Sequence, residues 1–163
     1  MSHTALTFQA LNIAVLTVSD TRDESTDTSG GYLVNALQDA GHQLTDKKIV
    51  KDDIYQMRAV VSNWIANETI QVILVTGGTG FTDRDSTPEA LTPLFDKTVE
   101  GFGELFRQLS FSEISASTIQ SRAIAGLANG TVIFCMPGST GACKTAWQQI
   151  IVSQLDASHK PCN

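Results

Sequence analysis

The chain has 163 residues, of which 17 are acidic and 11 are basic, so its formal net charge is −6. This balance argues against a nucleic-acid partner and against a membrane-surface partner, because both kinds of binding use basic patches. The length suits a single domain, placed here over residues 1–163, which can bury a core without disulfides or structural metals.

No apolar stretch of the sequence approaches the roughly 20 residues that cross a membrane. Residues 1–10 also lack the basic and then apolar pattern of a secretory signal. The three cysteines, Cys135, Cys143 and Cys162, are few and odd in number. This usage favours free thiols in a reducing cytoplasm over a disulfide framework.

Apolar runs alternate with helical patterns along the first half of the chain. Leu11–Val18 predicts a buried strand, and Asp27–Gly41 predicts a helix whose apolar residues recur at helical spacing. Leu44–Lys51 predicts a more polar strand near a sheet edge. Ile54–Asn67 predicts a second helix, and Val72–Val75 is apolar throughout, as in a parallel sheet that is covered on both faces.

The second half contains a helix start, a hairpin and a final helix. Ser86 or Thr87 can cap a helix that begins near Pro88. Asn129-Gly130 favours a type I′ turn. The other expected elements are a helix over Phe102–Phe111, hairpin strands over Arg122–Ala128 and Thr131–Met136, and a C-terminal helix over Ala142–Leu155.

The alternation of strands and helices predicts an α/β fold. We expect a three-layer α/β/α sandwich with a mainly parallel sheet, because strands joined through helices make right-handed parallel crossovers. The hairpin adds one antiparallel strand, expected at an edge.

Polar loops follow several of the predicted strands. In an open α/β sheet, ligands bind beyond the carboxyl ends of the strands. Gly-rich loops let backbone N–H groups approach phosphate oxygens, and Mg²⁺ joins carboxylates to phosphates. These loops therefore favour a site for polyphosphate and Mg²⁺. Their residues are Ser19, Asp20, Arg22, Asp23, Asp52, Asp53, Thr76–Gly80, Asp83, Arg84, Asp85 and Pro137–Thr140.

Each feature also has a purely structural interpretation. The glycines of Thr76–Gly80 can serve a tight turn with positive φ. Asp83 and Asp85 can be solvated loop charges or helix N-terminal charges. Asp53 can be the N-cap of the second helix, and Asp20 can simply face solvent.

Two familiar nucleotide signatures do not occur. No G-x-G-x-x-G follows the first strand. The run Gly138–Thr145 departs from a P-loop, because Cys143 stands where the second glycine is needed. We expect Cys143 to be an inert, partly buried thiol.

Five motifs in order carry a resemblance over residues 10–155. With them the chain resembles the MoaB/MogA family of molybdenum cofactor biosynthesis proteins, and its last motif is most similar to the MoaB branch. The motifs are Val18-Ser19-Asp20, Thr76-Gly77-Gly78-Thr79-Gly80, Arg84-Asp85 with Thr87-Pro88-Glu89, Gly101-Phe102-Gly103-Glu104 and Pro137-Gly138-Ser139.

The resemblance implies a fold, an assembly and an activity. Family members are α/β/α sandwiches that form homotrimers, or hexamers built from trimers. Active members use Mg-ATP to adenylylate molybdopterin and release pyrophosphate. Molybdopterin and ATP are therefore the expected ligands, with Mg²⁺ as the cofactor.

The resemblance also assigns roles to particular residues. It implies that Asp85 is catalytic and contacts Mg²⁺ or orients the ATP phosphates. It also implies that Asp52 is a second catalytic carboxylate, on the molybdopterin side or as a second metal contact. It leaves Glu104 with either a functional or a structural role. The substrate- and nucleotide-binding residues that it implies are Ser19, Asp20, Thr76, Gly77, Gly78, Thr79, Gly80, Pro137, Gly138 and Ser139.

The last loop departs from the adenylyltransferase pattern. Thr140 replaces the second proline of Pro-Gly-x-Pro, and Gly141 replaces the basic residue that usually follows. Losing a cation beside a polyphosphate removes a charge-assisted contact worth about 1.5–3 kcal/mol. Three hypotheses follow: an adenylyltransferase, a non-catalytic molybdopterin- or nucleotide-binding accessory protein, and a phosphate-binding protein outside this pathway.

Oligomer formation has modest support from the sequence. Phe81, Phe102, Phe106 and Phe111 gather around the loop and helix that follow the predicted site. The default expectation for these rings is core packing, and a subunit interface near the site is the alternative.

Overall fold

The computed structural model describes residues 7–156. Within them, six strands form one sheet in the order β2-β1-β3-β6-β5-β4. The four strands β2, β1, β3 and β6 are parallel, whereas β5 is antiparallel to β6 and β4 is antiparallel to β5. The strands are β1 (Asn12–Val18), β2 (Gln43–Val50), β3 (Val72–Thr76), β4 (Lys97–Thr98), β5 (Ile124–Ala128) and β6 (Thr131–Met136).

This sheet confirms the predicted α/β class and its mainly parallel character. β2 lies at one edge, as its polar sequence predicted. The hairpin strand β5 lies one place inside the opposite edge, because the two-residue strand β4 pairs along its outer side. Two residues, Lys97-Thr98, are too few for a sequence pattern to predict a strand. They are extended because they pair with β5 in the folded protein.

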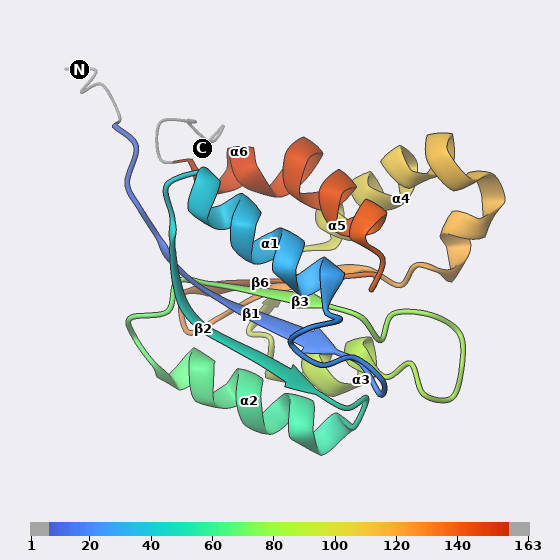
Figure 1. Cartoon of the computed structure of the whole chain (residues 1–163), viewed down its shortest axis with the longest axis horizontal. Coiled ribbons are helices and arrows are strands. Elements are labelled where there is room, and N and C mark those ends of the chain that lie inside the picture. Colours follow the sequence, from blue (N-terminus) through green and yellow to red (C-terminus); the bar gives the residue numbers. More distant parts are fainter. Residues whose placement is uncertain (1–6, 157–163) are drawn as a thin grey trace.

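Helices cover both faces of the sheet (Figure 1). α1, α4 and the C-terminal helix pack on one face, and α2 and α3 pack on the other. The α-helices are α1 (Thr28–Asp39), α2 (Ile54–Ala66), α3 (Thr87–Leu91), α4 (Glu100–Ile114), α5 (Thr140–Ala146) and α6 (Val152–Leu155), and the 3-10 turns are η1 (Thr92–Leu94) and η2 (Ser115–Gln120). A π-helical segment, η3 (Trp147–Ile151), joins α5 to α6, so the predicted C-terminal helix contains a π turn.

Acidic side chains begin α1 and α2. The carboxylate of Asp27 accepts a hydrogen bond from the backbone N–H of Gly30, and that of Asp53 accepts from Tyr55 and Gln56. These caps satisfy N–H groups that have no partner inside the helix. At α3, by contrast, Ser86 makes no capping bond, because its hydroxyl is directed to a carboxylate of the neighbouring loop.

The hairpin turn has the predicted geometry. Asn129 has φ of 51° and Gly130 has φ of 77°. Both central residues of a type I′ turn need positive φ. The turn therefore sets the register of β5 on β6.

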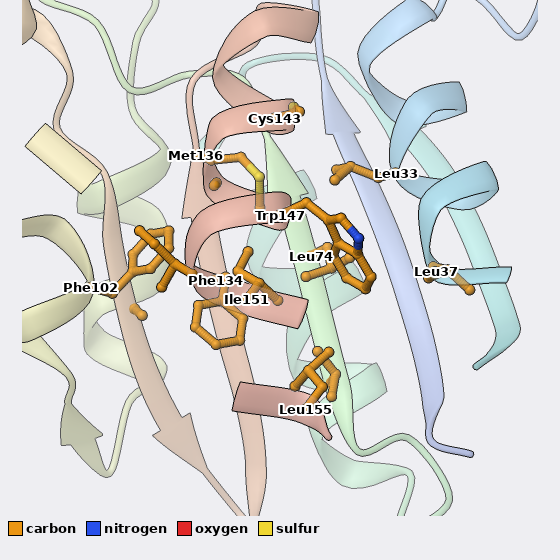
Figure 2. Packing of buried hydrophobic residues seen from close by; sticks show 14 of the residues in the cluster. Leu33, Leu37, Leu74, Phe102, Phe134, Met136, Cys143, Trp147, Ile151 and Leu155 are labelled. Carbon is orange, nitrogen blue, oxygen red and sulfur yellow. The ribbon is translucent and has the colours of Figure 1, made fainter. Parts of the chain in front are cut away.

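The core consists of two apolar layers, one on each face of the sheet. Every residue of β3 is buried, so this strand supplies side chains to both layers. Figure 2 shows one layer, where the Trp147 side chain extends from the C-terminal helix toward Leu33 and Leu37 of α1. Phe102 and Phe106 of α4 belong to the same layer, as the core expectation predicted.

The other two phenylalanines of that group lie outside the core. Phe81 and Phe111 are exposed, at 60% and 58% of their surface. None of the helices in residues 7–156 is long and apolar enough to cross a membrane.

Candidate functional site

A cavity of about 620 Å³ opens at the carboxyl ends of β1, β3 and β6. β1 leads to β2 on one side of the sheet and β3 is followed by β6 on the other, so a topological switch point lies between β1 and β3. Open α/β sheets bind ligands at such points. The cavity is lined by Thr17, Val18, Ser19, Thr21, Arg22, Ser29, Thr76, Gly77, Gly78, Thr79, Gly80, Asp85, Phe106, Ser110, Ile114, Ser117, Gln120, Ser121, Pro137, Gly138, Ser139 and Ala142.

Two glycines shape the loop after β3. Gly77 has φ of 107° and Gly78 has φ of 73°, a region that other residues rarely adopt. A Cβ atom on Gly77 would collide with the backbone oxygen of Val18, and one on Gly78 would collide with the hydroxyl of Thr87. The glycines therefore form a tight turn with positive φ, which was the purely structural alternative for this loop. The turn also brings the loop against β1 and α3.

This turn leaves a row of backbone donors unused. The carbonyl oxygen of Gly77 accepts from the hydroxyl of Thr87 at 2.7 Å, and that of Gly78 accepts from the Thr87 N–H at 2.9 Å. The N–H groups of residues 78–80, however, donate no hydrogen bond to the described residues. Unpaired N–H groups beside a cavity are suited to the oxygens of an anion.

Asp85 lies on the cavity wall. Its Oδ2 accepts hydrogen bonds from the backbone N–H of Thr82 at 3.0 Å and from the Thr82 hydroxyl at 2.8 Å. Its backbone oxygen accepts from Arg122 at 2.8 Å. Oδ1 accepts no hydrogen bond from the described residues, so one carboxylate oxygen stays available to a ligand.

Asp52 lies behind the loops and does not line the cavity. Its buried carboxylate accepts hydrogen bonds from the backbone N–H and the hydroxyl of Ser86. Burial raises the pKa of Asp52, as do the negative charges of Asp85 and Asp20, while the Ser86 hydrogen bonds oppose the shift. Asp52 thus holds the segment that carries Asp85.

Asp20 is also directed away from the cavity, although we expected it on the wall. Its carboxylate binds Arg84 through two hydrogen bonds of 2.8 and 2.9 Å and accepts a third from the backbone N–H of Asp52 at 3.1 Å. The hydrogen bond from Arg84 is the main cause that lowers the pKa of Asp20 to about 2. Asp20 and Asp52 therefore hold the residues on either side of Asp85.

The other predicted binding residues line the cavity. The Ser19 hydroxyl oxygen accepts from the backbone N–H groups of Thr21 and Arg22. Thr76 donates to the backbone oxygen of Pro137 at 3.0 Å, which joins the loops after β3 and β6. Ser139 caps α5 by accepting from the backbone N–H of Ala142 at 3.1 Å.

Cys143 lies under this site without reaching it. Burial raises the pKa of its thiol to about 11, so it is protonated at neutral pH. Cys143 is buried and free, and so is Cys135. Cys162 lies outside the described residues.

Comparisons with known proteins identify the family of this chain. A family model described as a probable molybdopterin binding domain matches residues 14–157. The chain belongs to this family. The chain is also similar to molybdenum cofactor biosynthesis protein B of Escherichia coli (strain K12), with 60% identity over 163 residues that cover 100% of this chain and 96% of that protein.

Solved structures agree with this assignment to the molybdopterin-binding family. A crystal structure of molybdenum cofactor biosynthesis protein B is 44% identical, covers 90% of this chain and 92% of its own, and superposes with a TM-score of 0.87. The tungsten cofactor synthesizing protein MoaB from Pyrococcus furiosus is 36% identical, with a TM-score of 0.78 and coverage of 87% and 91%. The protein therefore functions in molybdenum cofactor biosynthesis.

The sequence did not predict one wall of the cavity. It is formed by α4, η2 and the residue that follows them: Phe106, Ser110, Ile114, Ser117, Gln120 and Ser121. Such residues follow no strand and match no motif, so no local signal marks them. Only the packing of α4 across the sheet ends brings them to the cavity.

Two arginines of the site received no role from the sequence: Arg22 was placed among the polar loop residues without one, and Arg122 was not placed at the site at all. Arg22 lines the cavity, and Arg122 joins its surroundings by donating to the backbone oxygen of Gly80 at 2.9 Å, to that of Asp85 and to the carboxylate of Glu89. Arg22 stands in a polar loop after a strand, which was a usable signal. Arg122 comes before a strand, where the position of its side chain depends on tertiary contacts.

Proposed function

We propose that this protein transfers an adenylyl group from Mg-ATP to the phosphate of molybdopterin. One observation carries the proposal: residues 78–80 and Asp85 line a single cavity at the switch point, and their N–H groups and the Asp85 Oδ1 have no hydrogen-bond partner among the described residues. The N–H groups suit phosphate oxygens, and the carboxylate suits a phosphate-bound cation. Membership of the family supplies molybdopterin as the expected substrate.

The residues present fit a magnesium ion that arrives with its nucleotide. Mg²⁺ is commonly bound by one or two carboxylates together with substrate phosphates, and Asp85 offers one oxygen. Within residues 7–156, no group of three or more His, Cys, Asp or Glu side chains could hold a metal ion alone. When bound, Mg²⁺ would neutralise charge on the transferring phosphates.

The proposed reaction moves one adenylyl group between phosphate oxygens. An oxygen of the molybdopterin phosphate attacks the α-phosphorus of ATP, and the bond from that phosphorus to the bridging oxygen breaks. Adenylylated molybdopterin and pyrophosphate are the products. The contribution of this chain is to hold both phosphates in line, since such reactions depend mainly on positioning and charge stabilisation.

The rest of the cavity suits a ring system. Phe106 and Ile114 give it apolar surface, while Ser117 and Gln120 add hydrogen-bonding groups. A volume of about 620 Å³ lies within the usual range for small-molecule sites. These features support a pterin or a nucleobase beside the phosphate-binding loops.

A second candidate is a non-catalytic protein that binds molybdopterin or a nucleotide. The last loop favours this candidate, because it presents no cation to the cavity. Gly141 has no side chain, and the Thr140 hydroxyl donates to the hydroxyl of Thr28 at 3.1 Å. Calorimetry that shows binding of molybdopterin, with no pyrophosphate released from ATP, would support this candidate over the first.

We also propose a homo-oligomer, a trimer or a hexamer, acting in the cytoplasm. Exposed apolar side chains on α4 and η2 support the oligomer: Leu105, Phe111, Ile114 and Ile119. The two buried free thiols support a reducing compartment.

Asp85→Asn tests the enzymatic proposal. The amide keeps an oxygen for the Thr82 donors but loses the charge that would face the cation. We expect the rate of adenylylated molybdopterin formation to fall at least 100-fold while the melting temperature stays within a few degrees. Mass spectrometry of the product reads the rate, and an unchanged rate would remove Asp85 from the mechanism.

A further inference from the structure

We propose that Arg22 is the phosphate-binding cation of the cavity and holds a phosphoryl group through two parallel N–H donors. This inference rests on the proposed function, because it takes the ligand of the cavity to be a phosphate. The last loop supplies no positive charge to the cavity. In this proposal the charge comes from the loop between β1 and α1.

The charges on the cavity wall single out this residue. Among the described residues that line the cavity, Arg22 alone carries a positive charge and Asp85 alone carries a negative one. The whole chain has a net charge of −6. A polyphosphate that enters this acidic surface therefore meets one attractive side chain inside the cavity.

The other arginines near the site are already engaged. Arg84 binds Asp20 through two hydrogen bonds. Arg122 donates to two backbone oxygens and to the carboxylate of Glu89. Neither of the two lines the cavity.

Arg22 is held by one end and open at the other. Its Nη1 donates to the hydroxyl of Ser29, a fully buried residue of α1, at 3.0 Å, and approaches the backbone oxygen of Gly138 at 3.4 Å. Its backbone N–H donates to Ser19 at 3.0 Å. Nε and Nη2 make no hydrogen bond to the described residues.

This arrangement pre-orients the guanidinium for a phosphate. The contacts of Nη1 place the group between α1 and the loop after β6, on the same cavity as residues 77–80. A guanidinium presents fixed parallel donors that match two oxygens of one phosphate, whereas an ammonium offers a single point charge. The geometry thus predicts a role that lysine cannot fully replace.

A calorimetric titration of the intact chain with inorganic pyrophosphate, in the presence of Mg²⁺, tests this assignment. We expect Arg22→Gln to weaken binding about tenfold to 100-fold, as the loss of a charge-assisted contact would. Arg22→Lys should fall between this variant and the unaltered protein. Lys48→Gln removes one exposed positive charge from β2, away from the cavity, and should leave the affinity within twofold.

The results also separate this inference from the adenylyl transfer proposal. Unchanged pyrophosphate affinity in both Arg22 variants would overturn the role of Arg22, even if adenylylated molybdopterin is formed. Failure of the unaltered protein to bind millimolar pyrophosphate would overturn it as well. Binding that depends on Arg22, without any adenylylated product, would uphold the phosphate site and reject the enzyme.

A folding control keeps the test decisive. Each variant is first compared by thermal unfolding. If Arg22→Gln does not fold, Arg22→Lys and Ser29→Ala decide, because the first keeps the charge and the second removes only the Nη1 anchor. Weaker pyrophosphate binding by both folded variants supports the proposal, and full affinity in both overturns it.

Discussion

Three aspartates in neighbouring loops have different surroundings and therefore different chemistry. Asp20 binds Arg84, which holds its pKa far below the usual range. Asp52 is buried and feels two like charges, so its pKa is raised. Asp85 faces the cavity with one free oxygen. At the scale of single residues, the first two position the segment that presents the third.

Asp52→Asn should lower turnover without lowering stability. A raised pKa means that the ionised carboxylate is disfavoured in the folded protein. The cost in stability begins as the pH rises past the ordinary pKa of an unfolded aspartate and is complete above the raised pKa of the folded state. The amide removes that charge and keeps an oxygen acceptor for Ser86, but a neutral amide accepts a weaker hydrogen bond than a carboxylate does, so the segment that carries Asp85 is held less firmly. We expect a melting temperature at pH 7 that is unchanged or higher, with at least tenfold less adenylylated molybdopterin per unit time.

Thermal unfolding and the product assay check this expectation side by side. A melting temperature several degrees below that of the unaltered protein would show that the fold itself needs the Asp52 charge. Asp39→Asn, on the last turn of α1 and away from the cavity, is the matched control.

The connection from β3 to α3 is the element on which the site depends. Gly77 and Gly78 turn it sharply, and Thr87 at the start of α3 binds the carbonyl oxygens of both. Residues 78–80 line the cavity, and their N–H groups donate to none of the described residues. The short helix α3 and the glycine turn therefore act as one unit.

Gly78→Ala should break this unit. Its φ of 73° is unfavourable for alanine, and the new methyl group would collide with Thr87. We expect a loss of about 1–3 kcal/mol in the free energy of unfolding, with loss of pyrophosphate binding. Gly31→Ala, in α1 where a Cβ meets nothing within 4 Å, should instead gain about 0.4–1 kcal/mol. Urea unfolding measures the free energy of unfolding of both variants. Equal changes in the two would contradict the special geometry of Gly78.

At the scale of the whole molecule, sheet order brings the parts of the site together. β1, β3 and β6 end at Val18, Thr76 and Met136, so the loops that follow them are far apart in the sequence, yet the three strands are adjacent in the sheet. α4 then closes the cavity from one side and carries exposed apolar side chains on its outer surface. An assembly that covers α4 would lie close to the cavity.

Phe111→Glu tests that assembly. Its ring is 58% exposed on α4, so a charge there should disrupt an apolar interface while leaving the core intact. We expect sedimentation at micromolar concentration to show a smaller species than for the unaltered protein. Tyr55→Glu, which changes a more exposed ring on α2, should keep the original species. Identical sedimentation of all three proteins would reject an interface at Phe111.

Acid should destabilise the fold partly through His42. Burial lowers the pKa of this side chain, against the charge of Asp156, and its Nδ1 accepts from the backbone N–H of Leu11 at 3.0 Å. The stability that the neutral ring contributes is present above the unfolded pKa near 6.5 and is lost as the pH falls below it. Unfolding in urea at pH 7.5 and 5.5 should show a smaller loss for His42→Gln than for the unaltered protein; equal losses would contradict this role.

Local patterns were enough to predict most elements and about half of the residues that line the cavity. Apolar periodicity, the cap at Asp53 and the Asn129-Gly130 turn act within a few residues, so the sequence alone predicts their effects. The loops after β1, β3 and β6 were also predictable, because parallel strands end on the same side of a sheet.

Long-range packing decided the rest. The direction of each side chain at a strand end depends on partners far away in sequence, so Asp20 turns to Arg84 and Asp52 to Ser86 instead of facing the cavity. The wall from α4 and η2 and the edge strand β4 exist only once the helices and hairpin are packed on the sheet. Arg22 combines a local and a long-range effect. The sequence alone places it in a polar loop, but tertiary contacts engage only Nη1 of its guanidinium and leave the other two nitrogens for the proposed anion.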